Sequence, residues 1–431
     1  MRLRPFLIVF AAGCCLLSGC ATLTGWLKPA DHLSLHPATF NDLPGWNADD
    51  QSKTVVALQR SCGEMMLASP DAAFDVGGRK GTLKAWQDIC TQLAAAPPKD
   101  AVDARKFFEA HFVPYVMSGN QGTQGLFTGY YEPTLHGSYR RHGKYIVPIY
   151  GRPENLVTVN LGAFSPRFKG EHIVGRVNKD KTLVPYYDRA AIDKGALRGK
   201  SHTIVWVNNA VDAFFLHIQG SGRIVMTNGR VLRVGYAAQN GLPYVAIGRA
   251  MLKKGYLQEG NVSMQSIRAW LQSHPKEAAK VMDINQSYIF FRKLRGAKDP
   301  LDGPLGAEGV PLVPRRSLAV DHRLIPYGIP IWIDVQNPAD GNNVSAADGG
   351  KNIQRLMVAQ DTGGAIIGAV RGDFFWGSGK QATDLAGLMD SRGRAWMLLP
   401  KPPATPSLWH RFGGWFRRVL HMHGGKNGER R

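Results

Sequence analysis

The sequence is poor in cysteine and contains no obvious cluster of metal ligands. Only 5 of the 431 residues are cysteine, no two of them are spaced as C-x-x-C, and the 13 histidines are scattered along the chain. Because zinc sites draw on such closely spaced ligands, we expect no metal or other cofactor. No segment of about 20 to 50 residues repeats, which argues against a solenoid or a propeller.

The N-terminal apolar run is too short to cross a bilayer. It extends from Phe6 to Leu17 behind a charged start and ahead of small residues, as in a secretory signal peptide. The ending Leu17-Ser-Gly-Cys20 resembles a bacterial lipoprotein box, and the following alanine favours the outer membrane. We therefore expect a signal peptide over 1–19, lipid on Cys20 and a position at the outer membrane facing the periplasm. The alternative is an ordinary cleaved signal with a chance cysteine.

Cys62 and Cys90 are the cysteines that remain once the signal is removed and Cys20 carries lipid. Each shares the apolar face of a predicted helix. A disulfide between the two helices is one expectation for an oxidising compartment, and two buried free thiols are the other. Neither cysteine has an adjacent histidine, so no redox or nucleophilic role is expected.

Positive charge is in excess, since 53 Lys and Arg face 33 Asp and Glu and give a net charge of +20. In an exported protein this balance suits anionic lipid, lipopolysaccharide or the carboxylates of cell-wall peptides, and nucleic acid is not an expected partner. A generic solubilising surface is the alternative. The basic C-terminal tail, 400–431, is expected either to lie on an anionic membrane surface or to be weakly ordered.

Apolar periodicity predicts helices on both sides of a β-rich stretch, and the chain length makes two domains the default. Helices are expected over about 50–67, 82–96 and 102–112, and again over 243–253 and 264–281 with a break before Pro275. Between 125 and 234, short β-rich runs separated by turns predict a barrel or sandwich. These runs include 145–150, 202–207 and 214–218, and a second β-rich block is expected over 317–396.

The most informative segment begins at Asp361 and ends at Gly379. It reads DTGGAIIGAVRGDFFWGSG, so that Asp361 and Asp373 frame a glycine-rich stretch followed by the aromatic run 374–376. Glycines cluster where the backbone turns sharply or lies close to a ligand. Apolar faces beside a carboxyl are expected to raise its pKa. The combination suits acid catalysis on a sugar.

Together with a third carboxylate, this segment resembles a known enzyme family. Asp321 lies in LAVDHRLIPYG, where an apolar strand leads into a turn. The order of Ala-Val-Asp, Ile-Pro-x-Gly, Asp-Thr-Gly-Gly-Ala-Ile and Gly-Asp-Phe-Phe-Trp-Gly is similar to that of the membrane-bound lytic murein transglycosylase A family, with its three-aspartate "3D" barrel domain. Further similar segments are FTGYYEP at 127–133, HIQGSG at 217–222, YAAQNGLPY at 236–244, NQSYIFFR at 285–292 and GPLGA at 303–307.

The resemblance implies a mainly β fold with flanking helices. A double-psi β-barrel catalytic domain, formed by 49–130 and 301–399, would enclose a groove with an inserted glycan-binding β-barrel domain over 131–300. Residues 20–48 carry Pro, Gly and Asn with little periodicity, and are expected to form a lipid-anchored tether.

The resemblance also implies a reaction. It implies a peptidoglycan lytic exotransglycosylase, a lyase that cleaves the β-1,4 bond between N-acetylmuramic acid and N-acetylglucosamine. The muramyl C6 hydroxyl would attack its own C1 to leave a 1,6-anhydro ring. By motif position, Asp373 is the single acid and base, which requires a pKa above the usual value of about 3.9. The implied partners are glycan strands, the membrane and cell-wall synthesis or division complexes, with no cofactor.

The other site residues are assigned by motif and residue type. Asp361 matches a second acidic position that orients the acid or stabilises oxocarbenium charge, unless it only caps the turn that follows it. Asp321 is a candidate for substrate binding, with support of a barrel turn as the simpler role. Sugars stack on aromatic faces, and polar side chains bind their hydroxyls. The remaining substrate-binding candidates are Thr128, Tyr130, Gln219, Ser221 and Gly222.

Other functions are compatible with the same residues. A hydrolytic peptidoglycan glycosidase would use Asp361 and Asp373 as base and acid, with water attacking. A non-catalytic cell-wall-binding lipoprotein would use the barrel as a polysaccharide module. An aspartic protease needs two Asp-Thr/Ser-Gly loops, and this chain has one.

Overall fold

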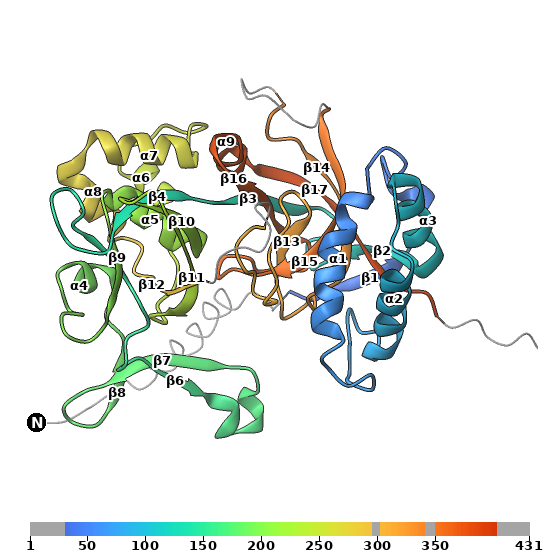
Figure 1. Cartoon of the computed structure of the whole chain (residues 1–431), viewed down its shortest axis with the longest axis horizontal. Coiled ribbons are helices and arrows are strands. Elements are labelled where there is room, and N and C mark those ends of the chain that lie inside the picture. The colour runs from blue at the N-terminus through green and yellow to red at the C-terminus, as the bar shows by residue number, and fades with distance from the viewer. Residues whose placement is uncertain (1–30, 295–301, 341–349, 403–431) are drawn as a thin grey trace, which may run out of the picture.

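The computed structural model describes residues 31–294, 302–340 and 350–402, and this part of the chain is mainly β. The expected signal peptide, Cys20 and the tail beyond residue 402 lie outside the described residues. Figure 1 shows two bodies side by side, one containing β1–β3, β13–β17 and α1–α3 and the other containing β4–β12 and α4–α8. The expected fold class, mainly β with two domains, is confirmed.

The first body is a closed barrel. Its strands follow the order β17-β14-β15-β13-β16-β3, and β3 pairs again with β17, which closes the circle. β1 and β2 extend the sheet beyond β17. The strands are β1 (Ser34–Pro37), β2 (Phe112–Ser118), β3 (Gly125–Glu132), β13 (Ser317–Val320), β14 (Pro330–Gln336), β15 (Asn352–Asp361), β16 (Arg371–Ser378) and β17 (Asp390–Pro400), with α9 (Lys380–Leu388) between the last two.

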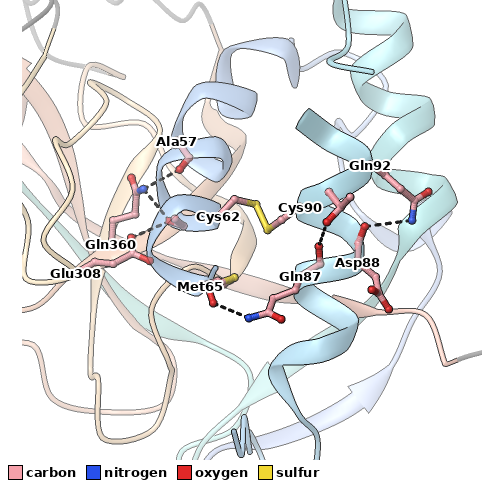
Figure 2. The surroundings of a disulfide bond; sticks show 11 residues. Ala57, Cys62, Met65, Gln87, Asp88, Cys90, Gln92, Glu308 and Gln360 are labelled. Atoms are coloured by element: carbon pink, nitrogen blue, oxygen red, sulfur yellow. Dashed lines mark hydrogen bonds between the residues drawn. A yellow bond between two sulfur atoms is a disulfide. The ribbon is translucent and has the colours of Figure 1, made fainter. Parts of the chain in front are cut away.

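Three helices cover one side of this barrel: α1 (Ser52–Met65), α2 (Leu83–Ala95) and α3 (Ala101–His111). They confirm the helices predicted from periodicity. A disulfide between Cys62 and Cys90 joins α1 to α2 (Figure 2). Thr54 Oγ1 of α1 donates a hydrogen bond of 2.9 Å to the Leu356 carbonyl oxygen of β15, so the helix layer is fastened directly to the barrel wall.

The second body is built on a sheet of order β12-β11-β10-β4-β9-β5, and a bridge between Gly151 and Phe291 links its two ends. Its strands are β4 (Thr134–Ser138), β5 (Val147–Tyr150), β9 (Thr203–Val207), β10 (Ser221–Met226), β11 (Val231–Gln239) and β12 (Ile289–Lys293). A separate three-stranded sheet contains β6 (Val157–Asn160), β7 (His172–Val177) and β8 (Leu183–Pro185). The helices are α4 (Arg189–Asp193), α5 (Ala210–Gln219), α6 (Ile247–Lys253), α7 (Met264–Ser273) and α8 (Pro275–Met282).

Two local predictions are wrong. Residues 214–218 form part of helix α5 and not a strand, because the Asn209 side chain caps the helix by accepting hydrogen bonds from the amides of Val211 and Asp212. The helix is buried on most sides, so its apolar run shows no polar stripe that would distinguish it from a strand. Helix α6 begins at Ile247 and not at residue 243, since the Asn285 side chain binds the preceding segment at the Val245 amide.

The tether expected over 20–48 is also wrong for the described residues 31–48. Strand β1 pairs with β2, and Leu43 and Trp46 are buried in the barrel-side core. The indole of Trp46 donates a hydrogen bond of 2.8 Å to Glu109 on α3. Composition rich in Pro, Gly and Asn indicates irregular backbone, but a few large apolar residues are enough to make such a segment pack.

Candidate functional site

Asp361 and Asp373 lie in one row of the barrel wall. On the central strand β13, Ala319 pairs with Asp361 of β15 on one side and with Asp373 of β16 on the other. Because neighbouring strands are spaced by about 4.8 Å, the two aspartate Cα atoms are roughly 10 Å apart. All three side chains line the same cavity of ≈ 360 Å³.

A bulge in β15 directs Asp361 into this cavity. The pairing of β13 with β15 skips Gln360, whose fully buried side chain points the other way. Its amide donates hydrogen bonds of 2.9 Å to the Ala57 carbonyl and to Ser61 Oγ on α1. An extra residue in one strand changes the direction of the side chains that follow it. The sequence contains no turn signal here, so this feature was not predicted.

The environment of Asp373 suits a carboxyl group that exchanges a proton. Thr128 Oγ1 on β3 donates a hydrogen bond of 2.7 Å to Oδ1, and Arg371 Nη2 donates one of 2.8 Å to Thr128. Within the described chain, Oδ2 of Asp373 has no hydrogen-bond partner. Burial raises the pKa of Asp373 to about 6, with a small further rise from Asp361, against the opposing effects of Arg371 and Thr128. A carboxyl with such a pKa can both donate and accept a proton near neutral pH.

Asp361 is held as a fixed acceptor. Its Oδ2 receives a hydrogen bond of 2.8 Å from the Tyr130 hydroxyl, and its Oδ1 receives backbone hydrogen bonds of 2.9 Å from Ala307 and Thr362. Burial raises the pKa of Asp361, and these three donors oppose the rise. With both oxygens engaged, Asp361 is suited to stabilise positive charge in the cavity and less suited to move a proton.

Of the two roles expected for Asp321, the structure favours support of a turn over substrate binding. It is buried and does not line the cavity. Arg323 binds both its oxygens at 2.7 and 2.8 Å, and the Gly368 amide donates to Oδ2 at 2.9 Å. Burial would raise the pKa of Asp321, but these hydrogen bonds hold it below its usual value. This carboxylate therefore fixes the glycine-rich segment between Asp361 and Asp373.

The cavity has one wall from each body. Of the predicted substrate-binding residues, Thr128, Tyr130 and Gln219 line it, whereas Ser221 and Gly222 lie in β10 away from it. A Cβ atom on Gly222 would come within 2.5 Å of Leu216, so this glycine serves close packing. Five further polar residues of the second wall were given no site role from the sequence, although all of them lie in the family-like segments 217–222, 236–244 and 285–292: His217, Gln239, Tyr244, Asn285 and Ser287.

The aromatic run after Asp373 does not face a sugar. Phe374 and Trp376 belong to the main core of the barrel, while Phe375 packs on Tyr130 with ring centroids 5.1 Å apart. None of the three lines the cavity that holds Asp373. The exposed tyrosine of the cavity is Tyr244, which comes from the second body. The apolar faces of residues 374–376, which the sequence suggested as a cause of the raised pKa of Asp373, therefore pack inside the protein and not against the cavity.

His217 lines the cavity as a neutral side chain. It is buried at the end of α5, and its Nδ1 accepts a hydrogen bond of 3.2 Å from the Ile289 amide. Burial lowers its pKa well below the usual value, with a further contribution from Arg189. This histidine is therefore not a source of positive charge for the site.

Neither a metal site nor a membrane-spanning helix is found in the part of the chain that the structure describes. No group of three or more His, Cys, Asp or Glu side chains in residues 31–294, 302–340 and 350–402 could hold a metal ion. No helix in these ranges is long and apolar enough to cross a bilayer.

Known proteins share this architecture and sequence. A family model for the MltA specific insert domain matches residues 126–292, and one for the 3D domain matches residues 316–399. Membrane-bound lytic murein transglycosylase A of Escherichia coli K12 is 34% identical over 280 residues, which are 64% of this chain and just under two thirds, 66%, of that protein.

Solved structures match over more of the chain. The membrane-bound lytic murein transglycosylase of Agrobacterium tumefaciens is 36% identical with a TM-score of 0.72, and the match covers 85% of this chain and 98% of that one. The structure of Escherichia coli MltA with bound chitohexaose is 26% identical with a TM-score of 0.59, and the match covers 86% of this chain and 95% of that one.

Proposed function

Because this chain belongs to the membrane-bound lytic murein transglycosylase A family of enzymes, we propose that it cleaves the β-1,4 bond between N-acetylmuramic acid and N-acetylglucosamine in peptidoglycan. The product would carry a 1,6-anhydromuramyl end. A polysaccharide substrate is supported by the cavity between the two bodies, and by the chitohexaose bound to the Escherichia coli relative.

In the proposed mechanism, Asp373 acts alone as acid and base. Its protonated carboxyl gives a proton to the glycosidic oxygen as the bond to C1 of the muramyl residue breaks. The resulting carboxylate then takes the proton of the C6 hydroxyl while that oxygen bonds to C1, so that Asp373 ends the cycle protonated. The observation that carries this proposal is the unpartnered Oδ2 of a carboxyl whose pKa is raised to about 6.

Asp361 supports the same step by charge. Positive charge develops at C1 and the ring oxygen when the glycosidic bond breaks. A carboxylate fixed by Tyr130, Ala307 and Thr362 stabilises that charge without reorientation. The different hydrogen bonding of the two carboxylates favours one proton-transferring residue over an acid and base pair.

We also propose where the enzyme is located and what each of the two bodies does. The barrel of 49–130 and 301–399 would carry catalysis, and the inserted body of 131–300 would contribute the second wall of the glycan groove. Lipid on Cys20 would hold the enzyme at the outer membrane facing the periplasm, in line with the names of its membrane-bound relatives. Release of a Cys20→Ser variant from the membrane fraction would support this anchor.

The test is digestion of purified sacculi by the parent protein and by Asp373→Asn. We expect the parent to release soluble muropeptides and Asp373→Asn to release none, while both sediment with sacculi to the same extent. Full activity of Asp373→Asn would remove this residue from the mechanism. A parent protein that binds sacculi without cleaving them would favour a cell-wall-binding module.

A further inference from the structure

The turn at 306–309 packs against the end of β15, next to Asp361. Its successive amides donate hydrogen bonds to two successive residues, Ala307 to Asp361 Oδ1 at 2.9 Å and Glu308 to the Gln360 carbonyl at 3.1 Å. A Cβ atom on Gly306 would lie 2.5 Å from that carbonyl oxygen, so only glycine permits this approach. The position of the turn thus decides whether Asp361 keeps its Ala307 donor.

The side chain of Glu308 fastens this turn to helix α1. Ser61 Oγ donates a hydrogen bond of 2.7 Å to Glu308 Oε2, and Ser61 Oγ in turn accepts one of 2.9 Å from Gln360 Nε2. Figure 2 shows Glu308 and Gln360 side by side against α1, on the helix face away from α2. The next residue after Ser61 is Cys62, whose disulfide attaches α1 to α2. The cluster therefore connects helix α1 to the turn that contains Ala307 and to Gln360, the residue before Asp361.

We propose that Glu308 is a positioning residue for Asp361. Through Ser61 it holds the turn in place, so that the Ala307 amide stays on Asp361 Oδ1. The expected effect of Glu308 on catalysis rests on the role of Asp361 in the proposed function. The expected effect of Glu308 on the pKa of Asp361 does not depend on that role.

Hydrogen bonding and not the charge of Glu308 carries this effect. Burial raises the pKa of Glu308 to about 7. Hydrogen bonding by Ser61 and Gln360 opposes this rise, and the nearby Glu64 adds slightly to it. Tyr327 is a further titratable group near Glu308, and it also faces Asp361. A group that is partly protonated at neutral pH cannot act as a constant charge. A glutamine of the same shape can still accept the Ser61 hydrogen bond.

The first test measures the pKa of Asp361 directly. Carboxyl carbon NMR of protein labelled with ¹³C at aspartate side chains, with Asp361→Asn to assign the signal, gives this pKa in each variant. We expect Glu308→Ala to raise the pKa of Asp361 by about one unit, because a donor to the ionised form is lost. Glu308→Gln should leave it near the parent value. Glu64→Ala, which removes an exposed acid one turn of α1 away, is the matched control and should also leave it unchanged.

The second test is the pH dependence of sacculus cleavage. For Glu308→Ala we expect a roughly tenfold lower kcat with little change in KM, and the acidic limb of the pH profile of kcat should move to higher pH. Glu308→Gln should restore the parent behaviour. A merely structural role would lower activity equally at all pH values. If Glu308→Ala does not fold, Ser61→Ala carries the same expectation. An unchanged pKa of Asp361 in both variants overturns the proposal, whereas an inactive parent overturns the proposed function and leaves the NMR result to decide the positioning role.

Discussion

Asp361 and Asp373 flank Ala319 from opposite sides, on the two strands that pair with β13. They share a row of the sheet and a cavity, yet their hydrogen bonds differ. Among residues 31–294, 302–340 and 350–402, Asp361 accepts three, from Tyr130, Ala307 and Thr362, while Asp373 accepts one, from Thr128. Two carboxylates that look alike in sequence are therefore chemically unequal, and the following predictions depend on that inequality.

Removal of the Tyr130 hydroxyl should weaken catalysis. Tyr130→Phe deletes a hydrogen bond of 2.8 Å to Asp361, and a hydrogen bond to a charged group contributes about 1.5–3 kcal/mol. We expect kcat/KM for glycan cleavage to fall by about 10- to 100-fold. Tyr186→Phe is the matched control, since it deletes a hydrogen bond of the same length to Asn155 outside the cavity. Equal effects of the two variants would contradict the assigned role.

Arg371 should determine the pH at which kcat/KM falls on the alkaline side of the pH profile. Its positive charge lowers the pKa of Asp373, so Arg371→Met should let that pKa rise above about 6. Because the acid step needs protonated Asp373, the alkaline limb of the kcat/KM profile should move to higher pH by about one unit. Profiles of the parent and Arg371→Met between acidic and alkaline pH measure this. A shift to lower pH would contradict the assignment of the limb to Asp373.

Ionisation of Asp373 should cost stability. The folded pKa of about 6 lies above the unfolded value of about 3.9, so the folded state binds more protons in between and the free energy of unfolding falls as pH rises through this window. We expect Asp373→Asn to raise the free energy of unfolding by about 2–3 kcal/mol at pH values above that window, and to have little effect below it. Urea unfolding at both ends of the window provides the measurement, and the same increment at both ends would refute the shifted pKa.

The disulfide should stabilise the helix layer. Cys62 and Cys90 are separated by 28 residues, and closing a loop of that length stabilises a protein by about 3–4 kcal/mol in the chain-entropy model. We expect Cys62→Ala/Cys90→Ala to lose about this much free energy of unfolding, and a reducing agent to destabilise the parent but not the double variant. Equal urea midpoints for parent and variant would show that the bond is not formed in solution.

Several features of the site were predictable because they are local in sequence. The motif that contains Asp361 and Asp373 can be read directly from the sequence, as can the segment that contains Thr128. The helices α1–α3 follow from the local spacing of apolar residues. The fold class followed from the family resemblance. Its confirmation shows that the motifs were specific enough to identify the architecture.

The rest depended on long-range packing. The sequence left two roles open for Asp321, substrate binding and support of a turn. Only the structure shows that its carboxylate binds Arg323 and the Gly368 amide and does not line the cavity. The sequence places the aromatic run 374–376 next to Asp373, but only the structure shows that its rings pack inside the protein and do not line the cavity. The second wall of the cavity includes Tyr244 and Asn285, which lie in the family-like segments 236–244 and 285–292. Those segments were recognisable in the sequence, but their position opposite Asp373 depends on how the inserted body meets the barrel.

The central claim is that one carboxyl, Asp373, moves the proton while the C6 hydroxyl of the sugar and not water attacks C1. Mass spectrometry of muropeptides released in water enriched in ¹⁸O tests it most directly. The account predicts products that lack the elements of water and carry no ¹⁸O, and none at all from Asp373→Asn. Reducing ends that contain ¹⁸O would contradict it, and would instead indicate a hydrolase that uses Asp361 and Asp373 as a pair.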